Sequence, residues 1–323
     1  MMRLKLVPDD TNFNFLGLWR YTFGLSMVLV VASLIGFFVV GLNFGIDFRG
    51  GTSIRTEATQ PVDIAAYRAA ITPLGVGDVS ITEVFDPTYG PERNVAMVRI
   101  QAQDDAEAVR PEVLAQVEAA LQGHDPTLSF TSVESVGPKV SGELVQDAVL
   151  AVLAALAGVL IYIWLRFEWQ FAVGAVAALI HDLILTIGVF TVLQLRFDLS
   201  IIAALLTIVG YSINDTVVVF DRMRENLIKF KQRPVIEVMN LSLNETLSRT
   251  LMTSFTTLIA LIALFMLGGD VIRGFVFAMI WGIFVGTWSS VYVAAVIVKR
   301  LGIKRDWGTK PTDKAGTQFG NPG

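Results

Sequence analysis

Six long apolar runs constrain this chain more than any other feature. A bilayer core of about 30 Å is crossed by about 20 mostly apolar residues in a helix. The runs cover residues 21–41, 142–165, 171–195, 200–220, 249–268 and 275–298. With 53% hydrophobic and only 17% charged residues, the chain is too apolar for an ordinary soluble domain. We therefore predict a polytopic α-helical membrane protein with six transmembrane helices, the first of them a retained signal anchor.

Basic residues predict which helix ends face the cytoplasm. If the N-terminus is inside, sixteen of the 25 Lys and Arg residues fall in inner segments, and the short outer loops hold only Arg196 and Arg273. Residues 1–20, the loop 221–248 and the tail 299–323 are then cytoplasmic. The loop mixes basic with apolar residues, which predicts an amphipathic helix at the inner surface, broken at Pro234.

Residues 42–141 form an extracytoplasmic domain between the first and second helices. Strand-like and helix-like stretches alternate there in the order βαββαβ, which is typical of a ferredoxin-like α+β fold. The stretches are 52–56, 61–74, 79–84, 95–101, 104–121 and 128–136.

Several functional classes find no support in the sequence. The external domain shows no Ser/His/Asp set and no HExxH helix, so we expect no catalytic residues. The chain has no cysteine, which excludes thiolate metal sites, and we expect neither a metal nor a cofactor. A net charge of −4 offers no basic field for nucleic acid.

The two junctions between the external domain and the membrane have unusual sequences. The chain leaves through GIDFRGG and returns through VGPKVSGEL. Glycine permits a positive φ and close backbone approach, and proline stiffens the return. The candidate junction residues are Gly45, Asp47, Arg49, Gly50, Gly51, Gly137, Pro138 and Gly142.

Charged residues at bilayer depth are the strongest functional signal, because each costs at least about 2.5 to 3.5 kcal/mol. Asp215 lies about 15 residues from the outer end of the fourth helix, and Arg249 about 19 from that of the fifth, or roughly 22 and 28 Å. Two interpretations are open. Arg249 extends to the inner headgroups while Asp215 makes an interior packing contact, or the two form a pair through which Asp215 takes up and releases a proton.

Other polar residues accompany this pair. Asn214, Ser212, Thr216 and Thr250 are supporting polar candidates. His181 and Asp182 occupy the middle of the third helix; adjacent residues point about 100° apart, so they need not form one site, and interior hydrogen bonding is favoured. Gly282 and Gly286 form a GxxxG pattern that lets helices approach closely.

Four ordered motifs together resemble the SecF family. They are GIDFRGG at 45–51, VGPKVSGEL at 136–144, GYSINDTVVVFDRMREN at 210–226 and NETLSRT at 244–250. SecF proteins are accessory subunits of the bacterial Sec preprotein translocase and are related to the resistance-nodulation-division transporters. The six-helix layout and the size of the external domain agree with this resemblance.

The resemblance implies a function and a set of partners. It implies a multi-pass protein of the bacterial inner membrane, a heterodimer with SecD, and association with the SecYEG channel and YajC. It also implies action on unfolded preproteins, powered by the proton motive force, with protons as the coupling ion. The family's proton-pathway aspartate and arginine correspond to Asp215 and Arg249, and no enzymatic activity is implied.

Two competing classes make different predictions. Half of a proton-driven small-molecule exporter of the same superfamily should carry larger external domains than the roughly hundred residues present here. An intramembrane aspartyl protease requires a GxGD signature, whereas Asp215 follows Ser212, Ile213 and Asn214.

Overall fold

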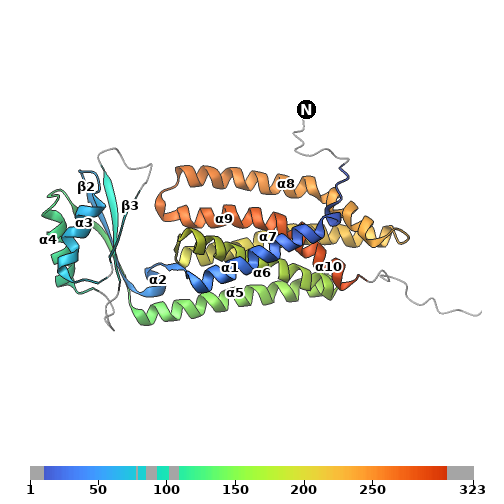
Figure 1. Ribbon diagram of the computed structural model, residues 1–323, viewed down its shortest axis with the longest axis horizontal. Helices are drawn as coiled ribbons and strands as arrows, with labels where there is room; N and C mark the ends of the chain where they lie inside the picture. The colour runs from blue at the N-terminus through green and yellow to red at the C-terminus, as the bar shows by residue number, and fades with distance from the viewer. Residues whose placement is uncertain (1–10, 78, 85–92, 102–108, 304–323) are drawn as a thin grey trace, which may run out of the picture.

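A helix bundle with a small domain at one end makes up the computed structural model, which describes residues 11–77, 79–84, 93–101 and 109–303 (Figure 1). Within these ranges, six helical spans are long and apolar enough to cross a membrane. They are α1 (Trp19–Val39), α5 (Pro138–Arg166), α6 (Trp169–Leu193), α7 (Leu199–Lys229), α8 (Val235–Leu267) and the composite of α9 (Asp270–Ser289), a π-helical turn (Ser290–Ala294) and α10 (Ala295–Leu301).

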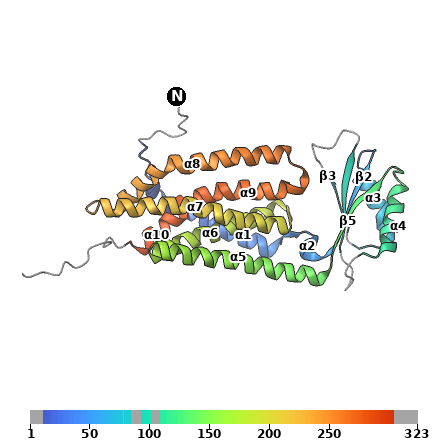
Figure 2. The same cartoon turned by 180° about the vertical axis from the view of Figure 1, so that it is seen from behind.

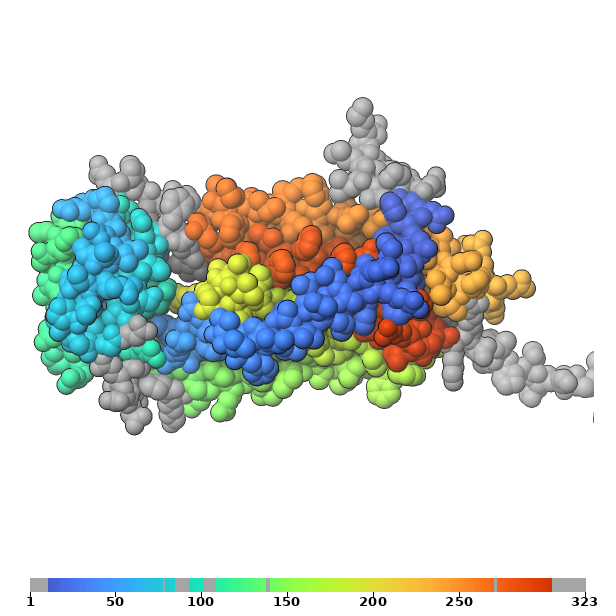
Figure 3. Space-filling model, in the orientation of Figure 1, coloured from blue at the N-terminus to red at the C-terminus, as the bar shows by residue number. Residues whose placement is uncertain are grey.

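The bundle core consists of two apolar clusters at different depths. The inner cluster is centred on Phe171 and Phe220, whose rings lie 5.0 Å apart, and the outer one on Phe190 and Phe197. Helices α6 and α7 supply the largest sets of buried residues, whereas α1 and α5 leave most of their apolar side chains exposed. Figure 3 shows α1 running diagonally across the outside of the bundle. A helix that exposes an apolar surface within membrane depth packs against lipid or another subunit.

Residues 221–248 do not form a separate amphipathic helix at the membrane surface, as was predicted, but belong to the ends of α7 and α8. Helix α7 continues past the membrane to Lys229, and α8 already begins at Val235. The predicted break at Pro234 is present, because Pro234 is the N-cap of α8, and proline is tolerated at a helix start where no backbone N–H is needed. The two extensions are joined by ion pairs and hydrogen bonds, including Arg222 Nε to Glu245 Oε2 at 2.6 Å.

The external domain is a four-stranded antiparallel sheet in the order β3-β4-β2-β5, covered on one face by α3 and α4 (Figure 2). Its elements are β2 (Gly51–Ala58), α3 (Ile64–Ile71), β3 (Val79–Val84), β4 (Asn94–Gln101), α4 (Pro111–Gln122) and β5 (Ser129–Val136). Alternate residues of the central strands, such as Ile54 and Val98, are fully buried beneath the helices. This arrangement, with the six helices, confirms the predicted fold class.

The buried carboxylate of Asp125 organises the turn before β5 and, through Thr127, connects it to the end of β2. Asp125, 1% exposed, accepts hydrogen bonds from the Thr127 backbone N–H at 2.9 Å and hydroxyl at 2.7 Å. Thr127 in turn contacts the Thr59 hydroxyl at 2.7 Å. Burial acts to raise the pKa of Asp125, but the hydrogen bonds from Thr127 and from the Gln60 backbone, together with the nearby His124, outweigh it and leave that pKa below the ordinary value.

We expect Asp125→Ala to lower the stability of the external domain by about 1.5 to 3 kcal/mol, the range for hydrogen bonds to a charged group. Because the folded-state pKa is depressed, this stabilisation is fully present above the unfolded-state value near pH 4 and is lost as the pH falls through the folded-state value. Hydrogen exchange of the sheet amides at several pH values measures it. Glu112→Gln, an exposed change on α4, is the control, and an unchanged exchange pattern in Asp125→Ala would contradict the assignment.

Candidate functional site

Asp215 is buried on α7 in the part of the bundle nearest α8. Helix α7 begins at Asp198, whose side chain accepts the Ser200 N–H at 3.1 Å and so caps the first turn. The Asp215 residue is 4% exposed, with Ser212 and Thr216 buried on the same face. Asn214, one residue earlier, points out of the fold and is exposed.

Helix α8 places Arg249 near Asp215 without a direct contact. The guanidinium acts on the carboxylate through space, and Thr253 lies within hydrogen-bonding reach of Asp215. Among the described residues, no guanidinium nitrogen of Arg249 lies within 4.0 Å of the Asp215 carboxylate. Arg249 is exposed in this single chain, whereas Thr250 beside it is 4% exposed. The sequence therefore placed the two charges on adjacent helices, but they are not in contact.

Hydrogen bonds join α7 to α8 on both sides of this pair. Toward the outer side, the Tyr211 hydroxyl donates to Thr257 Oγ1 at 3.3 Å. Toward the inner side, Asn226 Nδ2 donates to Ser242 Oγ at 3.1 Å. Asp215 thus lies in a polar part of the α7–α8 interface, with hydrogen bonds between the two helices on either side of it along the helix axis.

His181 and Asp182 form a second buried polar cluster, on α6. His181 Nδ1 lies 3.0 Å from Asp182 Oδ1, and the two side chains are 2% and 1% exposed. The other carboxylate oxygen accepts hydrogen bonds from Ser212 of α7 at 2.7 Å and Ser289 of α9 at 2.9 Å. An offset of about 100° around a helix therefore does not keep these neighbours apart, because both side chains are long enough to bend toward each other.

The GxxxG glycines of α9 are the contact surface for α7. A Cβ at Gly282 would overlap the Ile208 side chain, and one at Gly286 would lie 3.1 Å from Ser212 Cβ. Close approach at Gly286 is what brings Ser212 and Ser289 to the same carboxylate. These glycines therefore shape the polar cluster as well as the packing.

At the outer junction, the chain leaving α1 is bound to the loop between α6 and α7. The strands β1 (Asn43–Phe44) and β6 (Arg196–Phe197) pair in parallel, and Asp47 on the short helix α2 (Ile46–Arg49) accepts the Leu199 N–H at 3.0 Å. Neither the strand pair nor α2 was predicted, since two-residue strands and a single helical turn are too short to leave a periodic pattern.

The junction glycines have different structural roles. Gly50 and Gly51 adopt φ values of 74° and 135°, which favour glycine. Gly45 fits against the Phe197 carbonyl and Arg196. Gly137 precedes α5, which starts directly at Pro138, and the Ser141 hydroxyl reaches the Ile46 carbonyl at 3.5 Å. Gly142 has open space around it, and Arg49 is exposed at the end of α2, so nothing in the structure explains these two residues.

We expect Asp47→Ala to destabilise the start of α7 by about 1 kcal/mol, because a carboxylate that accepts a first-turn N–H is a helix cap in function. Asp47→Asn should lose only part of this, since an amide oxygen still accepts the bond. Hydrogen exchange at Leu199 measures the effect. Equal protection in the wild type and in Asp47→Ala would show that Asp198 alone fixes the helix start.

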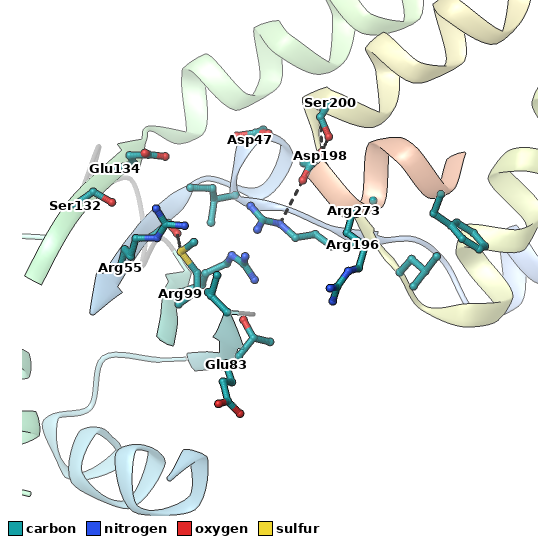
Figure 4. A pocket seen from close by; sticks show the side chains of 18 of the residues that line it. Asp47, Arg55, Glu83, Arg99, Ser132, Glu134, Arg196, Asp198, Ser200 and Arg273 are labelled. Carbon is teal, nitrogen blue, oxygen red and sulfur yellow. Dashed lines mark hydrogen bonds and ion pairs between the residues drawn. The ribbon is translucent and has the colours of Figure 1, made fainter. Parts of the chain in front are cut away.

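A cavity of about 810 Å³ separates the open face of the sheet from the outer ends of the helices (Figure 4). Arg55 and Arg99 project into it from the sheet, and Arg196 and Arg273 from the membrane side. Asp198 lies 3.6 Å from Arg196. The cavity lining has equal numbers of Arg and acidic side chains, so it has no dominant charge.

Comparisons with known proteins identify the family. The profile described as "Protein export membrane protein SecD/SecF, C-terminal" matches residues 116–304, and that of the "SecD/SecF GG Motif" matches residues 35–62. A "Protein translocase subunit SecF" from Cereibacter sphaeroides is 62% identical over 319 residues, which cover 99% of this chain and 98% of the relative. The chain belongs to the SecF family.

More distant SecF relatives and solved structures agree. A SecF subunit from Vibrio alginolyticus is 41% identical over 98% of both chains. The crystal structure of SecDF, a translocon-associated membrane protein from Thermus thermophilus, matches with a TM-score of 0.81 and 37% identity. The match covers 93% of this chain and 40% of the SecDF chain. A second SecDF structure, in a super-membrane-facing form, gives a TM-score of 0.69 at 38% identity.

Sequence reasoning missed several members of the polar clusters. Ser289 and Thr253 became visible only through their contacts. Ser289 and Ser290 form a small polar pair inside an apolar helix, a signal that could have been used. The π-helical turn that follows Ser289 has no sequence signature, although such turns occur often at functional sites.

Proposed function

We propose that this SecF-family chain is an accessory subunit of the Sec preprotein translocase that pairs with SecD and uses the proton motive force to promote completion of protein export. The observation that carries the proposal is Asp215, a buried carboxylate in the membrane within the influence of Arg249 on the next helix. Burying a carboxylate at this depth is energetically costly, so its presence indicates a function. One proton crossing 100 mV releases about 2.3 kcal/mol, which is available to drive a conformational change.

Separation of Asp215 and Arg249 suits a cycle of proton uptake and release. When the guanidinium is close, it favours the ionised carboxylate; when it moves away, the surrounding apolar medium favours the protonated form. A small shift of α8 relative to α7 therefore changes the proton occupancy of Asp215. By linkage, a change in proton occupancy also biases the helix positions. Each proton passing down its gradient can then drive one movement of the membrane helices and of the external domain attached to them.

A polar surface beside Asp215 is available for a partner subunit. Along α7, the exposed residues Thr207, Gly210 and Asn214 recur at helical spacing on one side, and Arg249 is exposed on α8. Small and polar side chains at membrane depth are typical of helix contacts between subunits. We assign this surface to SecD, which would bring its own acid to the proton pathway. The structural relatives are SecDF proteins, which supports this pairing.

The proposal extends to location and partners. The chain lies in the cytoplasmic membrane of a bacterium, with both termini inside and the α+β domain outside, and its complex with SecD associates with SecYEG and YajC. The beginning of α1 and the end of α10 lie at the bundle end opposite the external domain, in line with this orientation (Figure 1). No covalent chemistry is required, because the chain acts on the position of an emerging unfolded preprotein.

Reconstituted vesicles test the proposal. Vesicles containing the channel, its motor and a preprotein are compared with and without the SecD complex of this chain, each with and without a proton gradient, and full-length protected preprotein is measured. We expect the gradient to increase completed export only when the complex is present. A gradient effect that is equal in both kinds of vesicle would refute the assignment. Transport of a small molecule without any effect on preprotein would favour an exporter.

A further inference from the structure

We propose that His181 and Asp182 form a second proton-binding site in the membrane core, distinct from Asp215. His181 is the central residue of α6, which spans 25 residues, so the pair lies near the middle of the bilayer. Both side chains are almost completely buried. A histidine and an aspartate in contact at this depth are costly, and simpler interior packing needs neither.

Hydrogen bonds hold the carboxylate of Asp182 in one orientation. Oδ1 faces His181 Nδ1, and Oδ2 accepts from the hydroxyls of Ser212 and Ser289 on two other helices. Both Asp182 oxygens are therefore engaged. His181 Nε2, in contrast, is buried and has no hydrogen-bond partner among the described residues. The pair has one unengaged nitrogen at which a proton can arrive or leave.

Charge decides how many protons the pair holds. An ionised Asp182 beside a neutral imidazole carries a net charge of −1 in an apolar medium. Adding one proton gives a net charge of zero, whether the proton resides on the imidazole or is shared with the carboxylate. Since a net charge is costly at the bilayer centre, the pair gains from binding this proton, and its release requires a compensating change nearby.

The groups around the pair identify where that change comes from. Among the described residues, Ser289 of α9 and Ser212 of α7 donate hydrogen bonds to Asp182, and Asp215 lies three residues beyond Ser212 on the same helix. The other charged residues of the described helices packed against α6 lie toward the helix ends: Arg20 of α1, Glu143, Asp147 and Arg166 of α5, Asp221, Arg222, Arg224, Glu225 and Lys229 of α7, Arg273 of α9, and Lys299 and Arg300 of α10. Asp215 is therefore the one charged neighbour at comparable depth.

A local irregularity in the backbone adjoins the site. Ser289 is the last residue before the π-helical turn Ser290–Ala294, and its hydroxyl is one of the two that hold Asp182. Such turns change the helical register locally and occur often at functional sites. The loss or gain of a proton at the pair would change the bond to Ser289 directly. Only the assignment of this proton to preprotein export rests on the proposed function; the binding site itself does not.

Histidine magnetic resonance tests the site in the full chain. The chain has only two histidines, His181 and His124 of the external domain, so isotope-labelled histidine gives a spectrum that His124→Gln assigns directly. The labelled chain is embedded in lipid bilayers and the imidazole nitrogen signals are followed as the pH is changed. We expect the His181 signals to pass between two protonation states, and Asp182→Asn to weaken this proton binding about tenfold or more.

Ser289→Ala provides a second variant with the opposite expectation. It removes one donor to the ionised carboxylate, so the pair should bind its proton more tightly, whereas general disruption of packing would move both variants in the same direction. His181 signals that do not change with pH in the wild type, or that change identically in all three chains, overturn the proposal. Asp215→Asn is titrated alongside, and the His181 transition should persist in it even if Asp215 proves to have no part in export.

Discussion

Replacing Asp215 with asparagine is expected to abolish the stimulation of preprotein export by a proton gradient. Asparagine has nearly the same shape, but it cannot bind and release a proton. The residue is 4% exposed, so the change acts on a buried site and not on the membrane surface. Completed export in vesicles with a gradient should fall to the level measured without one, while assembly with SecD remains normal.

Two further variants make this result specific to the proton. Asp215→Glu retains a titratable carboxylate and should retain part of the stimulation. Asp221→Asn removes an exposed carboxylate six residues away on the same helix, where it pairs with Arg166 at 3.1 Å, and should leave the stimulation unchanged. If Asp215→Asn exports as well as the wild type in the presence of a gradient, the residue is structural and the proposed coupling is wrong.

Gly188→Val is expected to separate α1 from α6 and to destabilise the folded chain by about 1 to 3 kcal/mol or more, the cost of overpacking a tight interior contact. A Cβ at this position would overlap the Cβ and hydroxyl of Ser33 and would lie 3.2 Å from its Cα. Backbone atoms cannot rotate away as a flexible side chain can. The helices must therefore move apart.

Gly158→Val is the matched control. Gly158 lies in the middle of α5, and a Cβ there meets nothing within 4 Å. Both variants introduce the same β-branched residue into a membrane helix, so the difference between them isolates the contact with Ser33. Thermal unfolding in detergent, or protease resistance of the connection between α1 and the external domain, measures the effect. Equal stability of the two variants would show that α1 is not held against α6 at this position.

Periodicity and length were sufficient to predict the fold class. Apolar runs of membrane length and a βαββαβ alternation each leave a repeating signal over many residues, and both elements are present in the structure. The loop after the fourth helix was harder to predict, because its mixture of basic and apolar residues fits an interfacial helix as well as two helices extending out of the membrane. Pro234 marked the position of the turn, but it did not show that the segments before and after it are extensions of the two neighbouring membrane helices.

The candidate sites show a different limit. Helix lengths placed Asp215 and Arg249 at similar depth, but the distance between two flexible side chains depends on rotamers that a sequence does not specify. For His181 and Asp182, the pattern gave the depth but not the partners, since Ser289 lies 107 residues away in the chain. Contacts of this kind depend on close helix approach at glycines such as Gly286, and only the three-dimensional structure shows which helix meets which.

The two connections of the external domain differ mechanically. On the return, β5 passes through Gly137 directly into α5, a single helix of 29 residues and therefore about 44 Å long, which follows the whole length of the bundle (Figures 1 and 2). On the way out, Gly41, Gly50 and Gly51 all have positive φ values. One connection is thus a continuous, stiff helix, whereas the other is an irregular segment with several glycines. A tilt of the domain by about 5° would move the far end of a helix of this length by about 4 Å, so a force on the α+β domain would be transmitted to the opposite end of the bundle.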